Sequence, residues 1–174
     1  HRNSLKYYPR NDHPNIKVIN GDVLNFDLLA ESMKDVDVCV HAAAIAGIYS
    51  VGESTKKTMT VNLIGVYNAL ESSIKNNVKK FIDFSTSEVY GPFVFRGKET
   101  GSTTLGPLHE KRWVYAASKL ASEFMIHSYG SDSNLKVSSV RPFNVYGPRQ
   151  IGEGAIQQFI QKALRNEDII LYND

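Results

Sequence analysis

The sequence predicts an α/β fold with a doubly wound parallel sheet, on three observations. Short runs of apolar and β-branched residues alternate with longer amphipathic segments, which is the pattern of β-α-β units. The chain has 174 residues, 42% of them hydrophobic, which is enough for one domain with its own core. Polar motifs follow the apolar runs, and ligands of parallel sheets bind at these carboxyl ends of strands.

Each apolar run is short enough to be a strand. The predicted strands are residues 16–19, 36–41, 81–86 and 136–141, and residues 169–172 begin another. The run 36–41 is apolar apart from Asp37, so it is expected to be a buried strand.

The amphipathic segments between these runs predict helices. They cover residues 27–33, 58–76, 113–129 and 155–165. Asn25 or Asp27 is the candidate cap of the first helix. In the longest helix, apolar residues recur at helical spacing, namely Leu63, Tyr67, Leu70 and Ile74. Residues 91–111 show no periodicity and are expected to form a long loop, which is usually functional.

Composition narrows the class of protein. Lys and Arg number 20 against 18 Asp and Glu, a net charge of +2, so neither a nucleic-acid nor a membrane partner is expected. No apolar run approaches the roughly 20 residues that cross a bilayer, and the first residues do not form a signal peptide. The lone Cys39 excludes an internal disulfide and favours a reducing compartment, so a cytoplasmic location is predicted. The five histidines show no metal-ligand spacing, so no metal is expected.

Tyr115 and Lys119 are the first candidate catalytic pair. They are four residues apart, so both lie on one side of a helix. A phenol titrates near 10 in isolation, and a neighbouring ammonium ion favours the phenolate. Such a tyrosine can take the proton of a sugar hydroxyl while the carbon gives a hydride to a nicotinamide. Taken alone, the spacing is better explained by a surface pair of residues four apart on a helix.

Polar residues follow the strand 81–86. Thr86 ends this strand, so its hydroxyl is held at the sheet edge and can bond the same substrate oxygen as Tyr115. Ser87 and Glu88 come next, and a carboxylate there can act as a base or control a ketone intermediate. The alternatives are a threonine that caps a turn and a solvated turn glutamate.

Two further motifs indicate a nucleotide site. Asp22, in the Gly21-Asp22-Val23 run, can accept a hydrogen bond from an adenine amino group, although Asn-Gly-Asp is also an ordinary turn. Ala42, Ala43 and Ala44 follow a strand, and small side chains let the backbone approach a cofactor closely. Asn62 is polar where one helix face should pack, so it is expected to hold a water or a backbone group near the cofactor. His41 is expected to be a hydrogen-bonded structural residue.

The last motif follows the strand 136–141. Pro142 and Phe143 are expected to line the nicotinamide pocket. Asn144 can grip a sugar or phosphate oxygen, and Arg149 can meet a diphosphate or remain solvated.

Together these motifs resemble the extended short-chain dehydrogenase/reductase family of nucleotide-sugar epimerases, dehydratases and decarboxylases. The runs that carry the resemblance span nearly the whole chain: Gly21 to Val23, His41 to Ala44, Asn62 with Gly65, Ser85 to Gly91, Tyr115 to Lys119, and Arg141 to Arg149. The resemblance implies a Rossmann-type sheet, a tightly bound NAD, with NADP left open, and a nucleotide-sugar substrate. It also implies a homodimer through the helix around residues 63–74 and the one carrying Tyr115.

The resemblance also implies roles for single residues. The catalytic set is Thr86, Glu88, Tyr115 and Lys119. The cofactor contacts are Asp22, Val23, Ala42, Ala43, Ala44, Asn62, Ser85, Tyr115, Lys119 and Pro142. The substrate contacts are Thr86, Ser87, Asn144 and Arg149.

Within the family, the Thr-Ser-Glu run is similar to UDP-glucuronate decarboxylases and to some UDP-N-acetylglucosamine 4,6-dehydratases. Gly106-Pro107 followed by Arg112-Trp113-Val114-Tyr115 resembles the decarboxylase domain of the aminoarabinose lipid-A pathway. Decarboxylation of a UDP-glucuronate-type sugar is therefore the first expectation. A 4,6-dehydratase or a 4-epimerase is the alternative. Further alternatives are a non-catalytic NAD-binding relative and a reductase of small carbonyls. The intact Tyr, Lys and Thr set counts against the non-catalytic relative.

The chain departs from the family at its ends. It has no Gly-x-x-Gly-x-x-Gly run, which in the family lies on the first strand and helix. We therefore expect residues 1–174 to be a Rossmann-type NAD-binding domain truncated at both ends, with its first strands missing and with the substrate domain starting near residues 150–174. By itself such a polypeptide is expected to bind NAD poorly and to turn over nothing.

Overall fold

A computed structural model describes residues 14–148, 150 and 154–170. The chain divides into two compact units, one of residues 20–143 and one of residues 1–19 with 144–174. Each unit is described by itself.

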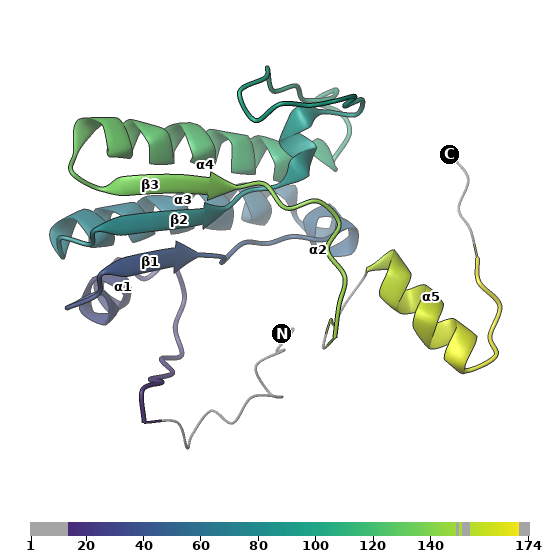
Figure 1. Ribbon diagram of the computed structural model, residues 1–174, viewed down its shortest axis with the longest axis horizontal. Coiled ribbons are helices and arrows are strands. Elements are labelled where there is room, and N and C mark those ends of the chain that lie inside the picture. The colour runs from purple at the N-terminus through teal and green to yellow at the C-terminus, as the bar shows by residue number, and fades with distance from the viewer. Residues whose placement is uncertain (1–13, 149, 151–153, 171–174) are drawn as a thin grey trace. The chain divides into compact units, whose positions relative to one another are not determined.

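A parallel three-stranded sheet forms the centre of the larger unit (Figure 1). The strands are β1 (Val38–His41), β2 (Lys80–Phe84) and β3 (Lys136–Val140), in the order β1-β2-β3. Both pairs are parallel, and residue 41 lies opposite residue 83. The predicted parallel sheet is confirmed, with each strand one or two residues shorter than expected.

Three predicted helices pack beside this sheet: α1 (Phe26–Ser32), α3 (Thr55–Lys75) and α4 (Trp113–Asp132). The Asn25 side chain accepts a hydrogen bond from the Leu28 N–H at 3.1 Å, so Asn25 is the cap of α1. Ser54 caps α3 in the same way, by accepting from the Lys57 N–H at 3.2 Å. The irregular chain before α4 confirms the predicted loop.

The buried face of α3 is not the predicted apolar stripe. Of the four stripe residues only Leu70 is fully buried, and Tyr67 and Ile74 are exposed. The buried face consists largely of small and polar residues, which are Thr58, Asn62, Gly65, Val66, Asn68, Ala69, Ser72 and Ser73. Helix α3 packs closely against both α1 and α4, and small side chains permit that approach.

One glycine shows how close this packing is. A Cβ at Gly65 would lie 2.8 Å from a methyl carbon of Val23, so a larger residue would push the 22–24 turn off α3. The Asn68 amide holds the same turn, because its Nδ2 donates to the Val23 carbonyl at 3.0 Å. The Gly21-Asp22-Val23 motif is therefore fixed by α3.

Within the described residues of the larger unit, helices cover one face of the sheet. Phe81 is fully buried in a core to which α3 and α4 contribute. The other buried residues of this core are Met33, Val66, Ala69, Leu70, Val78, Ile126 and Leu135. Side chains at alternate positions face away from these helices and are exposed, among them Val38, Val40, Phe84 and Val140. The expectation of a buried strand at 36–41 is therefore wrong for one of its two faces.

Three further expectations differ from the structure. Residues 16–19 form no strand, and Ile16, Val18 and Ile19 are exposed; none of the three strands in the described part of the chain pairs with them. Residues 169–170 are not in a strand, and 171–172 lie outside the described residues. Two short helices were not predicted, α2 (Ile48–Glu53) and the 3-10 helix η2 (Ser87–Tyr90). Both are too short to show a helical period.

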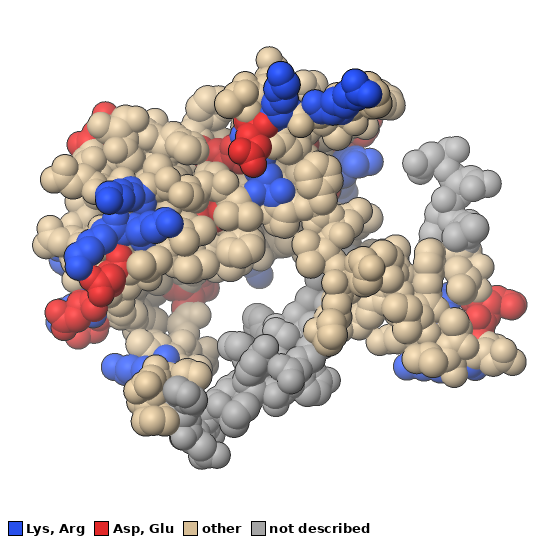
Figure 2. Space-filling view, viewed as in Figure 1, with Lys and Arg blue, Asp and Glu red and all other residues tan. Residues whose placement is uncertain are grey.

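The smaller unit contains α5 (Ala155–Leu164), which confirms the last predicted helix. No helix in the described ranges is long and apolar enough to cross a membrane. On the face of the molecule shown in Figure 2, basic and acidic residues are interspersed over the described residues.

Candidate active site

The predicted catalytic residues come from η2 and α4, which pack against each other. Thr86 is the cap of η2, and its Oγ1 accepts a hydrogen bond from the Glu88 N–H at 3.3 Å. The backbone on either side is tied to the chain after β3, because the Ser85 N–H donates to the Val140 carbonyl at 2.7 Å and the Ser87 N–H to the Pro142 carbonyl at 3.0 Å. Thr86 is therefore buried and fixed at the sheet edge, as predicted.

Tyr115 and Glu88 line one cavity of about 240 Å³. Its other lining residues are Lys111 and Arg112, before α4, and Gly47, Ile48, Val51 and Gly52, in and next to α2. A phenol, a carboxyl group and two cationic side chains thus surround a space large enough for part of a sugar. This arrangement can move protons at an oxygen and hold an anionic group.

The carboxyl group of Glu88 is half-buried and its pKa is raised. Burial is the larger cause, and the positive charge of Arg112 acts in the opposite direction. A carboxyl group with a raised pKa is suited to proton transfer near neutral pH.

The pKa of Tyr115 is also raised, which contradicts the prediction that Lys119 would lower it. Burial is the largest cause, the carboxylates of Glu88 and Asp83 add to it, and a hydrogen bond with Thr86 acts in the opposite direction. Lys119 does not offset these effects, because it forms an ion pair with a different group.

That group is Asp83 of β2. The Lys119 Nζ donates to the Asp83 Oδ1 at 3.2 Å, and the two side chains are only 3% and 0% exposed. The other oxygen of Asp83 has no hydrogen-bond partner among the described residues. Burial raises the pKa of Asp83, and Lys119 acts against this. Lys119 therefore lies inside the protein in an ion pair.

His41 lies beside this pair on β1, opposite Asp83 in the sheet. It is buried, and its ring stacks on that of Phe81 with the centroids 6.0 Å apart. Burial and the charge of Lys119 together lower the pKa of His41 to about 4. A neutral histidine in the core agrees with the structural role that the sequence predicts, although no partner of its nitrogens is described.

The low pKa of His41 makes stability depend on pH. Between the ordinary value of 6.5 and about 4, the unfolded chain binds a proton that the folded chain does not, so the free energy of unfolding decreases as the pH is lowered. The expected loss from pH 7 to pH 4 is on the order of 3 kcal/mol. Urea unfolding of a His41→Phe variant should lack this share of the pH dependence. The exposed His127, replaced by Gln, is the control, and an equal effect of both replacements would contradict the assignment.

Asn62 connects the alanine run to the catalytic helix. It is buried, its Oδ1 accepts from the Ile45 N–H at 2.8 Å, and its Nδ2 donates to the Ile45 carbonyl at 3.2 Å and to the Ser118 Oγ at 2.9 Å. The Ser118 hydroxyl in turn donates to the Tyr115 carbonyl at 2.7 Å. The prediction that Asn62 holds a backbone group is confirmed.

Replacing Asn62 with Ala should leave the N–H and the carbonyl of Ile45 without these partners. We expect a loss of about 1 to 3 kcal/mol in the free energy of unfolding, measured with urea. Ser128, whose hydroxyl bonds only its own helix at Phe124, provides the matched control as Ser128→Ala. Equal stabilities of the two variants would show that the amide does not hold the loop.

The described residues fit NAD in part. Ala42 and Ala43 are exposed at the end of β1, where small side chains leave the backbone open to a flat ring. Asp22 is exposed, and its carboxylate, which accepts from the Leu24 N–H at 2.9 Å, can also accept from an amino group. The glycine-rich run that would hold a pyrophosphate does not occur in this sequence.

The remaining predicted site residues are placed as follows. Val23 and Ala44 are partly buried, and Ser85 is buried, with its hydroxyl close enough to the Glu123 carboxylate to lower the pKa of that group. Asn144 belongs to the smaller unit, and Arg149 lies outside the described residues. Their substrate contacts stay predictions. No group of three metal-binding side chains occurs among the described residues.

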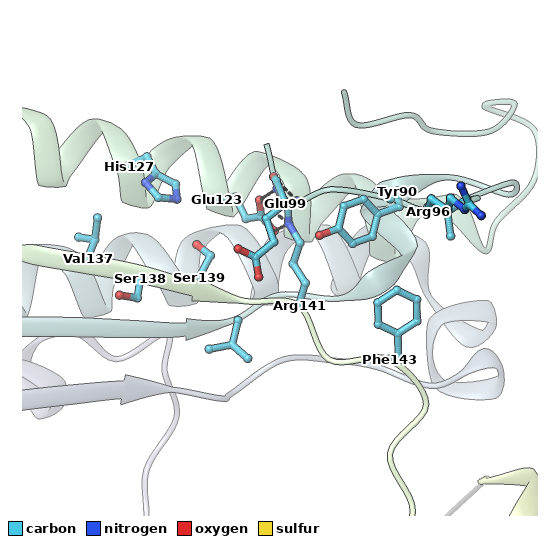
Figure 3. Close-up of a pocket in the computed structure, with 13 residues that line it drawn as sticks. Tyr90, Arg96, Glu99, Glu123, His127, Val137, Ser138, Ser139, Arg141 and Phe143 are labelled. Atoms are coloured by element: carbon cyan, nitrogen blue, oxygen red, sulfur yellow. Dashed lines mark hydrogen bonds and ion pairs between the residues drawn. The ribbon is translucent and has the colours of Figure 1, made fainter. Parts of the chain in front are cut away.

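A larger cavity of about 940 Å³ lies elsewhere, beside β3 and α4 (Figure 3). Arg141 crosses it and binds the carboxylate of Glu123, and the guanidinium carbon lies 4.9 Å from the centre of the Tyr90 ring. Neither Tyr115 nor Glu88 lines this cavity. The smaller cavity is therefore the candidate active site, on chemistry rather than size.

Sequence reasoning missed three features of the site. Helix α2 lines the cavity but is too short to be predicted. Arg112 was noted only as part of a motif, and Lys111 only as the end of the predicted loop. Asp83 was overlooked, although it is two residues after Phe81 and so had to share the covered face of the strand.

Three known proteins are similar to this chain in sequence or structure. A UDP-N-acetyl-alpha-D-glucosaminuronate decarboxylase of Bacillus cytotoxicus is 34% identical over 92% of this chain and 50% of its own length. The structure of a UDP-N-acetylglucosamine 4-epimerase from Methanobrevibacter ruminantium matches with a TM-score of 0.86 and 28% identity, over 98% of this chain and 54% of that one. A UDP-glucuronic acid 4-epimerase from Bacillus cereus, solved with UDP-glucuronic acid and NAD, gives 0.81 and 31%, over 93% and 50%.

The chain spans about half the length of the curated relatives that it matches. The similar structures confirm the Rossmann-type α/β fold, and the NAD dependence of the family agrees with the predicted cofactor. The family model described as "NAD dependent epimerase/dehydratase family" matches residues 2–174. The chain therefore belongs to the NAD dependent epimerase/dehydratase family.

Proposed function

We propose that this chain carries the catalytic residues of an NAD-dependent enzyme that oxidises the C4 hydroxyl of a nucleotide sugar and decarboxylates a UDP-glucuronate-type substrate. The single observation that carries the proposal is the cavity in which Tyr115 and Glu88 meet Lys111 and Arg112. A neutral sugar has no need of two cations there, whereas a sugar acid has a carboxylate for them to bind.

Each residue of the cavity has a role in this proposal. Tyr115 takes the proton of the sugar hydroxyl, and Thr86, which is fixed beside it, orients the same oxygen. NAD, when bound, accepts the hydride from the sugar carbon. Glu88 then transfers the proton of the second step, and burial, which raises its pKa, favours its protonated form relative to that of an exposed carboxyl group. Asp22, Val23, the 42–44 run and Pro142 are the proposed cofactor contacts.

The test uses the protein that carries this chain, NAD, and UDP-glucuronate. Carbon dioxide release and a product lighter by one carbon dioxide support decarboxylation. An unchanged acid excludes it, and UDP- and dTDP-hexoses then distinguish the alternatives. Loss of water indicates a 4,6-dehydratase, the class of a relative from Dictyostelium discoideum that is 28% identical over 91% of this chain. Unchanged mass with inverted C4 indicates an epimerase.

Replacing Arg112 with Met should weaken binding of the acid substrate. Arg112 lines the cavity, and loss of a hydrogen bond to a charged group costs about 1.5 to 3 kcal/mol. We expect a KM for UDP-glucuronate raised about tenfold to a hundredfold, and little change for UDP-glucose. The exposed Arg96, replaced by Met, is the matched control. Equal increases in KM for the acid and for the neutral sugar would show that Arg112 does not bind the carboxylate of the substrate.

We further propose that α3 and α4 form a homodimer interface. Their outer surfaces expose Ile64, Tyr67 and Phe124, of which Phe124 is 67% exposed. The start of a substrate domain near residues 150–174 is proposed likewise. Sedimentation of a Phe124→Glu variant, compared with the unmodified protein, tests the interface. If both proteins sediment as dimers of the same mass, this interface is contradicted.

A further inference from the structure

The ion pair between Asp83 and Lys119 indicates a role for Asp83 that is not part of the proposed function. This role rests on the proposed function, because it concerns Tyr115 as the base. In this fold, the pairing of Lys119 conflicts with what a catalytic Tyr115 requires. The tyrosine acts as a base only if a positive charge stabilises its phenolate, yet Lys119 lies in a buried ion pair with another residue.

We propose that Asp83 is a positioning residue, which holds the Lys119 ammonium ion on the covered face of the sheet and keeps it from giving its full charge to Tyr115. The pairing distance of 3.2 Å and the near-complete burial of both side chains make this contact the local determinant of where the ammonium ion lies. The second oxygen of Asp83 is buried and has no hydrogen-bond partner among the described residues, so Lys119 is the partner that the structure describes for this carboxylate.

The surroundings of Asp83 leave Lys119 as its source of positive charge. His41 on β1 faces it and is held neutral, since its pKa is lowered to about 4. Glu123 on α4 adds a negative charge, but its own partner is Arg141, whose Nη2 lies 2.6 Å from the Glu123 carboxylate. Ser139 lies opposite Asp83 on β3 and carries no charge.

The surroundings of Tyr115 show the consequence. Glu88 from η2 and Asp83 from β2 both oppose its ionisation, and Thr86 favours it. Arg112 lines the same cavity but acts on Glu88. Asp83 therefore acts on Tyr115 twice, through its own charge and through the lysine that it holds. Both effects oppose formation of the phenolate on which the proposed role of Tyr115 as a base depends.

The test is the titration of Tyr115 itself, which does not depend on turnover. Tyrosinate absorbance is recorded against pH for the protein that carries this chain, and the curve of its Tyr115→Phe variant is subtracted. Asp83→Asn should move the midpoint of Tyr115 to lower pH by about one unit. The same replacement in a Lys119→Met background should move it much less, because no ammonium ion is released there.

The outcomes separate this inference from the proposed function. An unmoved midpoint in Asp83→Asn overturns the inference, and so does an equal shift in both backgrounds, which would mean that Asp83 acts on Tyr115 only directly. If Asp83→Asn does not fold, Asp83→Ser, which leaves room for water beside Lys119, takes its place. A shifted midpoint in a protein that modifies no nucleotide sugar would retain the role of Asp83 and exclude the proposed function. In an active enzyme, the alkaline-rising limb of the pH–rate profile should move with the midpoint.

Discussion

A Tyr115→Phe variant is expected to lose sugar oxidation by a factor of about 10² to 10⁴, which is the usual contribution of a positioned acid or base. The phenol is the group in the candidate cavity that can receive a hydroxyl proton beside the fixed hydroxyl of Thr86. Removing its oxygen takes away that acceptor and leaves the ring, so packing of α4 should change little. The rate of product formation with UDP-glucuronate and NAD is the measurement.

The control for this variant is Tyr49→Phe. Tyr49 lies on α2, next to the cavity-lining Ile48, and is 71% exposed, so loss of its hydroxyl should leave the rate unchanged. Because the pKa of Tyr115 is raised, the wild-type rate should increase with pH from neutral into the alkaline range, and Tyr115→Phe should abolish that increase. A Phe variant that keeps more than about a tenth of the rate would remove Tyr115 from the catalytic set.

Local patterns predicted much of this fold correctly. Asn25 caps α1 as its residue type predicts, and the alternation of short apolar runs with long helices specifies the parallel sheet. Patterns of one segment do not say which neighbour covers it. The stripe from Leu63 to Ile74 looked like a core face, but small residues of α3 allow closer packing against α1 and α4 and so form the buried side. Residues 16–19 have strand composition, yet a strand also needs a partner.

In the candidate site, too, the sequence predicted some features correctly and others not. Thr86, Glu88 and Tyr115 follow strand ends or begin helices, so their approximate meeting place could be predicted from topology. The partner of Lys119 could not, because it depends on which face Asp83 takes and on what lies opposite it. The direction of the Tyr115 pKa was wrong for this reason. A charge relation drawn from the spacing of two residues holds only if no third charge is nearer.

Arg141→Ala is expected to be strongly destabilising, because it leaves a buried carboxylate without its arginine partner. Arg141 binds Glu123 through two nitrogens, with Nε at 2.9 Å from Oε1 and Nη2 at 2.6 Å from Oε2, and the Glu123 side chain is only 6% exposed. Breaking a buried ion pair from one side costs about 3 to 5 kcal/mol. Urea unfolding should show a loss of about 4 kcal/mol.

The pH dependence of that loss identifies its cause. Burial is the largest single effect on the pKa of Glu123 and raises it, but the hydrogen bonds and charge of Arg141, together with Ser85 and His127, outweigh burial and lower the pKa overall. A lowered carboxyl pKa contributes stability above the unfolded value of about 4.5, and this contribution disappears as pH falls through the folded value. The difference between wild type and Arg141→Ala should therefore shrink in acid, where Glu123 is neutral in both. Arg96→Ala, at an exposed arginine of the same cavity, should cost little at any pH. A loss of stability in Arg141→Ala that is the same at neutral and acid pH would mean that Arg141 acts by packing on Tyr90 rather than through the charge of Glu123.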